Sequence, residues 1–306
     1  GLRDDKLMVI APIEDTPAAK AGILANDVIL EIDGKSTKGI SIKDAADKIR
    51  GPQGTTVTLL IKRENKEITY TIKRDKIDVK AVSIKQPKTC PIASNVGYIR
   101  LNSFLSQTAS KEMEDALKQL GNKEGYILDL RSNPGGLLTN AIFISDMFLS
   151  SGNIVSTVDR DGYRETQKAN PGVITNKPLV VLIDEGSASA SEILSGALKD
   201  NGRAVLVGTK SFGKGLVQEI NRLPDGAGMN ITTQKYLTPN GTDINKKGIV
   251  PDIKIKNTPE DVEKKKDKQL EKAHKVLEEL ISNNKRAKNE PKIINPELPL
   301  RIIIEK

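Results

Sequence analysis

The hydrophobic pattern of the chain changes near residue 96, and this change limits the folds that it can adopt. Before that point, short alternating apolar runs are separated by turn residues, which indicates a small β-rich unit. After it, continuous apolar runs such as Leu179–Ile183 alternate with segments of helical spacing. That order favours a sheet with parallel strand pairs and covering helices, so we expect an α+β fold overall.

The first unit should contain several short strands and two helical segments. Gly51 and Pro52 end the second helical segment, and a polar turn at residues 64–66 joins the last two strands. The pattern predicts strands over 6–13, 27–32, 55–62 and 67–72, and helical segments over 16–22 and 41–49.

The second unit should alternate strands with helices, and a Lys-rich region follows it. The pattern predicts strands over 96–101, 126–130, 179–183 and 204–207, and helices over 109–120, 137–149 and 189–199. Beyond residue 257 we expect an amphipathic helix over 267–281 and a basic tail to residue 306, strand-like over 301–304.

Cys90 is the only cysteine and His274 the only histidine, which excludes several kinds of site. An intrachain disulfide cannot form, and the usual Cys and His metal sites cannot be built. A cysteine peptidase or a Ser-His-Asp triad would need His274, which lies in a Lys-rich helical segment. We therefore expect no metal or cofactor, and a general base other than histidine.

Charge and aromatic content restrict the partners of the chain. The net charge is +8, and much of the excess lies in runs such as residues 264–266 and 285–286. Such runs are typical of a solvated helix face, and an anionic membrane surface or an acidic partner is the alternative. Aromatic residues make up only 3%, which argues against nucleic acid as a partner.

No apolar stretch reaches the 18 or more residues of a membrane-spanning helix. The chain opens at Gly1 without a signal peptide, so we expect the sequence to be a trimmed form of a longer chain.

Ser189 lies where a buried strand passes into a helix. Ser189 and Glu192 fit a capping box, with serine at the N-cap and glutamate at N3, which is the ordinary structural interpretation. The same position also suits chemistry, because the free N–H groups of a helix N-terminus can stabilise a developing oxyanion. The small neighbours Ala188 and Ala190 leave room for a polypeptide.

Lys214 lies between two glycines, where most lysines are simply solvated. The segment from Gly208 to Lys214 also matches much of a phosphate-binding loop. That match fails at Gly215, where serine or threonine should hold Mg²⁺, and no clear helix follows. Nucleotide binding is therefore a third hypothesis, behind two others given below.

The segment Asn133-Pro-Gly-Gly136 follows a strand and is typical of a plain turn. Its glycines would also let a substrate carbonyl approach the main chain closely, which is the functional alternative.

Together these segments resemble the catalytic domain of the C-terminal processing, or tail-specific, peptidases. The resemblance rests on five blocks in the same order and extends over about residues 1–256. The blocks are Asp129-Leu-Arg-Ser-Asn-Pro-Gly-Gly136, Gly186-Ser-Ala-Ser-Ala-Ser-Glu-Ile193, Gly208-Thr-Lys-Ser-Phe-Gly-Lys-Gly-Leu-Val-Gln218, Leu237-Thr-Pro-Asn-Gly241 and Gly248-Ile-Val-Pro-Asp252.

The resemblance implies a serine–lysine mechanism. Ser189 corresponds to the nucleophile, Lys214 to the general base, and Gln218, one helical turn later, to the residue that positions the lysine. The backbone N–H groups of Gly135 and Ala190 correspond to the oxyanion donors. Because lysine acts as a base only when neutral, we expect the Lys214 side chain to be shielded from water and close to the Ser189 hydroxyl in the active state.

The first unit resembles a PDZ domain, which binds an extended peptide as an added strand and holds its terminal carboxylate. The groove should lie between residues 7–13 and the helix over 41–49. In the family, the carboxylate-binding loop precedes this strand, but the chain begins at Gly1. We therefore expect the first strand and that loop to be missing.

These inferences define the expected organisation. Residues 1–76 should form the PDZ domain, 77–95 a linker, 96–256 the serine–lysine peptidase domain and 257–306 the terminal helix and basic tail. The function that the resemblance implies is endopeptidase cleavage of proteins near their C-termini, with substrate tails recruited or sensed by the PDZ domain. A catalytically inert peptide-binding scaffold is the second hypothesis.

The resemblance also implies where the protein acts and on what. Family members act outside the cytoplasm, in a periplasm, a cell envelope or a plastid lumen. The expected partners are proteins or peptides with accessible C-termini. Association with a membrane surface and with further copies of the chain are open alternatives.

Overall fold

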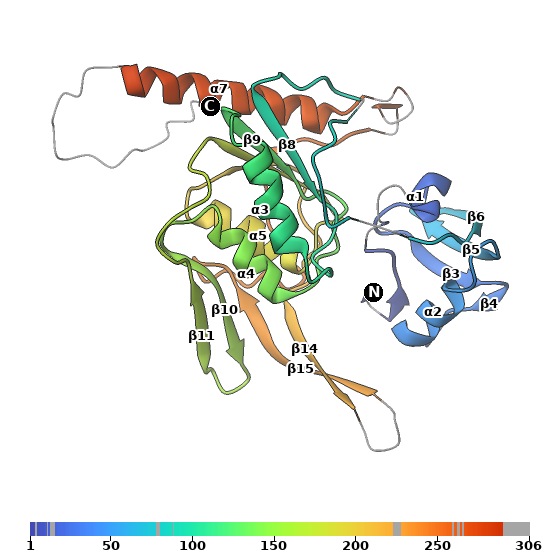
Figure 1. Cartoon of the computed structure of the whole chain (residues 1–306). Coiled ribbons are helices and arrows are strands. Elements are labelled where there is room, and N and C mark those ends of the chain that lie inside the picture. Colours follow the sequence, from blue (N-terminus) through green and yellow to red (C-terminus); the bar gives the residue numbers. More distant parts are fainter. Residues whose placement is uncertain are drawn as a thin grey trace.

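A computed structural model describes residues 1–289 except residues 4, 11, 13–15, 78–79, 88, 223–227, 259, 262–263 and 265. A small domain, drawn in blue, lies beside a larger α/β domain (Figure 1). The basic tail expected at the C-terminus, including the strand-like residues 301–304, lies outside the described residues.

The small domain is an antiparallel sheet of order β4-β3-β5-β6 with two short helices. Its core is the apolar side of the sheet, where Ile32 and Ile61 are almost fully buried, packed with Ile23 and Ala45. The elements are β1 (Leu2–Arg3), β2 (Lys6–Leu7), α1 (Pro17–Ala21), β3 (Val28–Ile32), β4 (Lys35–Ser36), α2 (Ile42–Ile49), β5 (Thr56–Arg63) and β6 (Lys66–Lys73).

Both helices begin directly after an N-cap residue. Thr16 and Ser41 cap α1 and α2 by accepting backbone N–H groups of the first turn, and Gly22 ends α1 in a left-handed conformation. The strand expected over 6–13 is shorter, because β2 ends at Leu7 and residues 11 and 13 are not described.

The larger domain is built on a six-stranded sheet of order β16-β13-β12-β9-β8-β7. All neighbouring strands are parallel except β7 and β8, so the sheet is mixed, as expected. The strands are β7 (Val82–Ser83), β8 (Val96–Leu101), β9 (Gly125–Asp129), β12 (Leu179–Ile183), β13 (Val205–Gly208) and β16 (Ile253–Lys254). Strand β7 belongs to the stretch that the sequence assigns to the linker.

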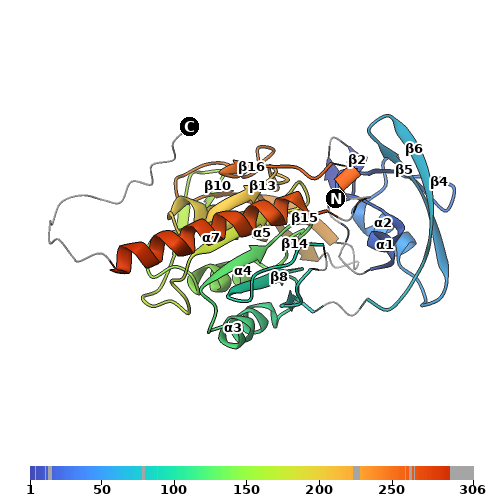
Figure 2. The ribbon, with the colours of Figure 1, turned by 90° about the horizontal axis from the view of Figure 1, so that it is seen from above.

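Helices cover both faces of this sheet, as Figures 1 and 2 show. Alternate residues of one strand enter opposite cores: Val181 packs with α3, α4 and α5, whereas Val180 and Leu182 pack with α7. Burial on both faces explains the continuous apolar run of β12. The helices are α3 (Ala109–Gln119), α4 (Leu138–Asp146), α5 (Ala190–Asp200) and α7 (Lys268–Asn289).

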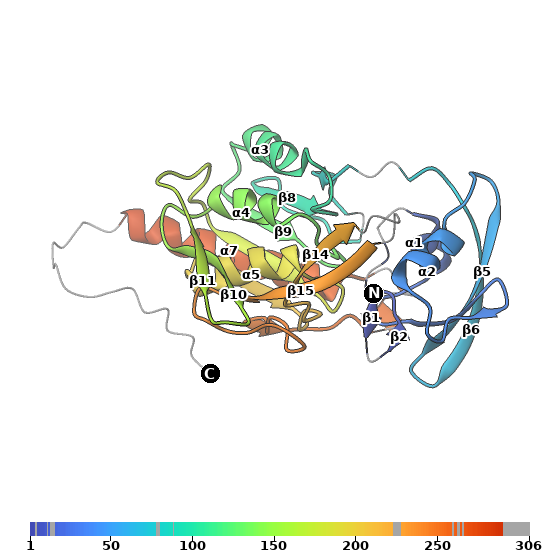
Figure 3. The ribbon, with the colours of Figure 1, turned by 90° about the horizontal axis from the view of Figure 1, so that it is seen from below.

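A second sheet, of order β11-β10-β15-β14, has no counterpart among the predicted strands. Figure 3 shows its strands on the side of the domain that α5 covers, and α5 contacts β10 directly. Polar residues dominate two of its strands, so their hydrophobic alternation is weak. Its members are β10 (Asn153–Asp159), β11 (Arg164–Lys168), β14 (Leu216–Arg222) and β15 (Gly228–Leu237).

The structure confirms the predicted α+β class with a β-rich first domain, a mixed sheet and a terminal helix. Helix α7 extends to Asn289, beyond the predicted end at residue 281. In the described part of the chain, no helix is both long enough and apolar enough to cross a bilayer.

Candidate active site

Three loops meet at the carboxyl ends of neighbouring parallel strands. Residues 130–137 follow β9, residues 184–189 follow β12, and residues 209–215 follow β13. Since these strands are adjacent and parallel, their loops lie at one edge of the sheet, where α/β proteins place their sites. The predicted residues Gly135, Ser189 and Lys214 lie in these three loops, one in each.

Ser189 occupies a strained turn between β12 and α5. Its φ of 55° and ψ of −114° belong to a region that residues with a side chain rarely adopt. The neighbours Ala188 and Ala190 are buried, whereas Ser189 is partly exposed. A serine on such a sharp strand-to-helix turn is typical of hydrolases with a serine nucleophile.

Gly135 packs directly against this turn. Its φ is +92°, and a Cβ there would come within 2.5 Å of the Ala188 carbonyl oxygen and 2.9 Å of the Ser189 Cβ. Only glycine fits both the conformation and the space. The glycine loop and the serine turn are therefore fitted to each other.

Asn133 ties the same two loops together. It is fully buried, and its amide donates to the Leu101 carbonyl oxygen at 2.6 Å. The Asn133 carbonyl oxygen accepts hydrogen bonds from the Ala188 N–H at 3.0 Å and the Ser191 hydroxyl at 2.9 Å. A buried polar network of this kind fixes a single loop geometry.

The two predicted oxyanion donors differ in whether their N–H group already has a hydrogen-bond acceptor. The Ala190 N–H begins α5, so it has no intrahelical partner, and the described residues provide no other acceptor for it. The Gly135 N–H instead donates to the Asn133 side-chain oxygen at 2.9 Å.

Glu192 links the serine turn to the lysine loop. Its side chain is fully buried in the first turn of α5, and it accepts four hydrogen bonds. Burial raises the pKa of Glu192, and the four donors act in the opposite direction. The donors are the Ser189 N–H (2.9 Å), the Lys214 N–H (2.8 Å), the Gly213 N–H (2.7 Å) and the Ser211 hydroxyl (2.5 Å).

The Glu192 carboxylate brings Ser189 and Lys214 together. Both N–H groups donate to the same oxygen, Oε2, so the two backbone nitrogens lie within about 6 Å of each other. The capping-box pattern identified Glu192 only as the cap of a helix. Its bonds to residues 211–214 come from a distant part of the chain and leave no local signal in the sequence.

The prediction that the Lys214 side chain is shielded from water is not met in this structure. Lys214 is exposed, and its ammonium makes no hydrogen bond or ion pair with the described residues. The reason is that Glu192 holds the loop through its backbone, while the flanking Gly213 and Gly215 provide no side chain to cover the lysine.

Gln218 does not lie one helical turn after Lys214, as the resemblance implied. It lies on β14, where it pairs with Thr232 across a register shift, and its side chain is exposed. Pairing with β15 imposes an extended conformation on this segment, so the four-residue spacing does not place the two side chains on one helix face.

An ion network at the end of β9 anchors α7 near the site. Buried Asp129 contacts Arg100 at 3.0 Å and Arg131 at 2.6 Å, and Arg131 reaches Asp267 before α7 at 2.8 Å. Burial by itself would raise the pKa of Asp129, but Arg131 and Arg100 hold it below its usual range. The network thus fixes the strand end from which the glycine loop leaves.

Arg3 of the small domain contacts the lysine loop. Its guanidinium lies 4.7 Å from the centroid of the Phe212 ring and 3.4 Å from the Phe212 carbonyl oxygen. The small domain therefore touches a residue two positions before Lys214.

The other candidate groups lie away from these loops. His274 accepts the Ala93 N–H at 3.2 Å, and Cys90 is buried against α7, where burial raises the pKa of its thiol. A strand, β14, follows the 208–214 loop where a nucleotide-binding loop needs a helix, so the nucleotide hypothesis loses its structural basis. Among the described residues, no cluster of His, Cys, Asp and Glu could hold a metal ion.

Fold and site together define the class of PDZ-containing peptidases with a serine turn at the sheet edge. A family model of peptidase family S41 matches residues 95–255, and a PDZ domain model matches residues 8–63. The chain belongs to peptidase family S41.

Curated relatives and a solved structure agree with this assignment. The chain is 48% identical over 260 residues to a carboxyl-terminal-processing protease of Picosynechococcus, covering 83% of this chain and 62% of the relative. It is 41% identical over 256 residues to the carboxy-terminal processing protease CtpA of Bacillus subtilis, covering 82% and 54%. The chain thus spans little more than half the length of such relatives.

The structure of a photosystem II D1 C-terminal processing protease superposes with a TM-score of 0.78 at 33% identity. The match covers 90% of this chain and 73% of that one. This likeness confirms the predicted family and fold.

Proposed function

We propose that this chain hydrolyses peptide bonds near the C-termini of protein substrates, with Ser189 as nucleophile and Lys214 as general base. The observation that carries the proposal is the Glu192 carboxylate, whose Oε2 binds the backbone N–H groups of both residues. The close fit of Gly135 against the serine turn supports it.

The chemistry follows from these positions. The Ser189 hydroxyl oxygen attacks the substrate carbonyl carbon and passes its proton to the neutral Lys214 amine. The oxyanion is held by the Ala190 N–H and by the Gly135 N–H, which exchanges its bond to Asn133 for one to the oxyanion. Lys214 then protonates the leaving amine, and water hydrolyses the resulting ester with Lys214 again taking the proton.

The exposure of Lys214 gives the bound substrate a second role. A lysine surrounded by water favours its charged form, which cannot accept a proton. We propose that the substrate backbone covers Lys214 when it occupies the site, and that Gln218 then helps to position the amine. Desolvation of the base would thus coincide with substrate binding.

We propose a separate role for each of the predicted domains. Residues 1–76 recruit or sense a substrate tail, 77–95 connect, 96–256 catalyse, and 257–306 pack on the catalytic domain and assemble copies or meet a membrane surface. The contact of Arg3 with Phe212 supports communication between the first domain and the lysine loop. By analogy with the processing proteases it resembles, we place the protein outside the cytoplasm.

The test incubates the 306-residue chain with an unstructured protein such as casein and identifies products by mass spectrometry. We expect cleavage near the C-terminus, and a loss of at least about 10³-fold in rate for Ser189→Ala. Peptides with a free or an amidated C-terminus report on recruitment by the first domain. If neither the wild-type protein nor the Ser189→Ala protein cleaves but both bind peptide, the chain is the inert scaffold of the second hypothesis.

Gly135→Ala should lower kcat/KM for the same substrate by about 10²-fold, because the new Cβ would displace the Ser189 turn. Gly162→Ala is the matched control: its φ of +86° is similar, but nothing lies within 4 Å of the added Cβ. Since alanine at a positive φ strains the backbone to a similar degree in both variants, the control isolates the contact with Ser189. Equal activity of the two variants would contradict the fitted geometry.

A further inference from the structure

An exposed apolar surface begins beside the glycine loop. Leu105 and Leu137 are 64% and 40% exposed. A bridge between Phe104 and Gly136 places these leucines side by side, and the Leu137 N–H donates to the Phe104 carbonyl oxygen at 3.0 Å. Gly136 follows Gly135, which packs on Ser189, so this apolar surface adjoins the proposed nucleophile.

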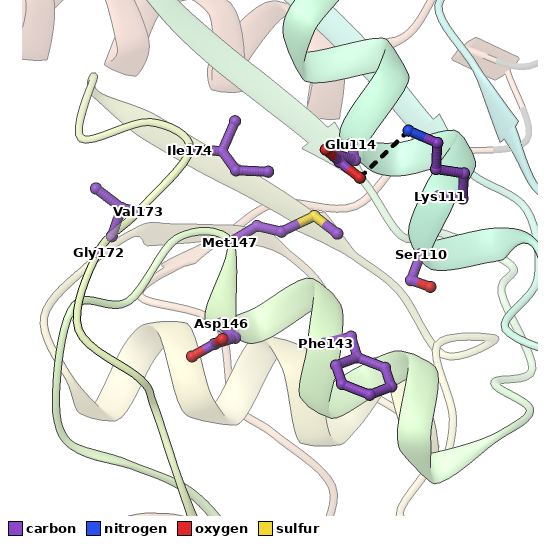
Figure 4. A pocket seen from close by; sticks show the side chains of 9 residues that line it. All are labelled: Ser110, Lys111, Glu114, Phe143, Asp146, Met147, Gly172, Val173 and Ile174. Carbon is purple, nitrogen blue, oxygen red and sulfur yellow. Dashed lines mark hydrogen bonds and ion pairs between the residues drawn. The ribbon is translucent and has the colours of Figure 1, made fainter.

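The two leucines stand at the starts of two packed helices. Helix α3 begins four residues after Leu105, and α4 begins directly after Leu137. A groove of about 560 Å³ opens where the first turns of α3 meet the second half of α4 and residues 172–174. Figure 4 shows Met147 between Ile174 and Phe143, with the Lys111–Glu114 ion pair on the α3 side.

The groove is apolar where α4 meets residues 173–174, it is charged on the α3 side, and it is already formed. Phe143 is 59% exposed, and Val173 and Ile174 are about 40% exposed. Asp146 binds the Asn170 N–H at 2.6 Å, and the Ile174 N–H donates to the Met147 carbonyl oxygen at 2.9 Å, which fixes the groove wall to α4. A contiguous apolar surface of this kind marks a binding site for another chain.

We propose that this surface binds an apolar segment of the substrate polypeptide, outside the residues that flank the cleaved bond. The occupant is argued from continuity along α4. Of the residues from Leu137 to Met147 that are not buried, all are apolar except Thr139 and Asp146, so an apolar strip links the glycine loop to the groove. This inference rests on the proposed peptidase function and adds a second substrate contact to it.

The geometry sets the position of the segment. Leu137 and Met147 are ten residues apart on or beside α4, which corresponds to about 15 Å along the helix. An extended peptide covers that distance with about five residues. Large apolar side chains five to seven residues from the cleaved bond should therefore reach the groove.

The experiment compares unstructured peptides that share one cleavable bond. Each peptide carries either two leucines or two serines five to seven residues from that bond, and peptides are made with the pair before the bond and with the pair after it. For the wild type, we expect kcat/KM to be about tenfold higher for a leucine peptide than for its serine counterpart. Phe143→Ser should bring this ratio close to one. Tyr163→Ser, which removes another exposed aromatic side chain from the β10–β11 turn, is the matched control and should keep the ratio.

A binding assay separates this inference from the proposed function. Fluorescence anisotropy with the Ser189→Ala protein should show tighter binding of the leucine peptide, and loss of that preference when Phe143→Ser is added. A wild-type ratio near one together with equal binding overturns the inference even if cleavage occurs. Conversion of a dimer to a monomer by Phe143→Ser in sedimentation would assign the groove to a subunit interface and also overturn it.

Discussion

Replacing Lys214 with alanine should lower peptide cleavage by about 10³-fold while the protein stays folded. The loop depends on the Lys214 backbone N–H, which donates to Glu192 whatever the side chain is. The side chain itself is exposed, so its loss should change the free energy of unfolding by less than about 0.5 kcal/mol. Initial rates and urea denaturation measure the two quantities.

Two further variants make this prediction specific to proton transfer. Lys214→Arg keeps the positive charge but cannot lose a proton, so it should be as inactive as the alanine variant. Lys210→Ala removes another exposed lysine from the same loop and should retain activity. Full activity of the arginine variant would exclude lysine as the base.

Replacing Glu192 with glutamine should damage both stability and activity. An amide has one acceptor oxygen where the carboxylate has two, so at least one of the three backbone N–H donors would face an NH₂ group. Each buried donor left without an acceptor costs about 1–3 kcal/mol, so we expect the free energy of unfolding to fall by about 2–5 kcal/mol. Cleavage should fall by about 10²-fold, because Ser189 and Lys214 lose their common anchor.

Glu185→Gln is the matched control for Glu192. Glu185 is partly exposed and pairs with Lys256 at 3.6 Å, so its replacement should change stability by less than about 1 kcal/mol. Hydrogen exchange at the amides of Gly213 and Lys214 should accelerate only in the Glu192 variant. Unchanged exchange there would show that the carboxylate does not hold the loop.

Lowering the pH should reproduce, in the wild type, part of the loss of cleavage that we expect for Glu192→Gln. Because burial raises the pKa of Glu192, this carboxylate takes up a proton at a higher pH than an exposed glutamate does. Protonation removes acceptor capacity from the four-bond cluster, so cleavage should decline on acidification before exposed glutamates titrate. The glutamine variant should lack this decline.

The sequence by itself determined the elements whose residues have a local signature. Strand β12 was predicted at its observed bounds, because burial on both faces demands an unbroken apolar run. Helices α1 and α2 were both predicted, and α2 followed from its helical spacing and from the Gly51-Pro52 stop after it. The candidate residues Gly135, Ser189 and Lys214 were predicted from the blocks that carry the family resemblance, since each block is a short run of neighbouring residues.

Only the tertiary structure decided how those residues meet. The Glu192 bonds to Ser211, Gly213 and Lys214 join positions 19 to 22 residues apart, and no periodicity records such contacts. Pairing with β15 gives the segment around Gln218 its extended conformation, and its own residues do not record that partner, so Gln218 was misplaced on a helix. The exposure of Lys214 could not be predicted from the sequence either. It depends on whether distant segments of the chain cover the loop, and the loop sequence does not record that.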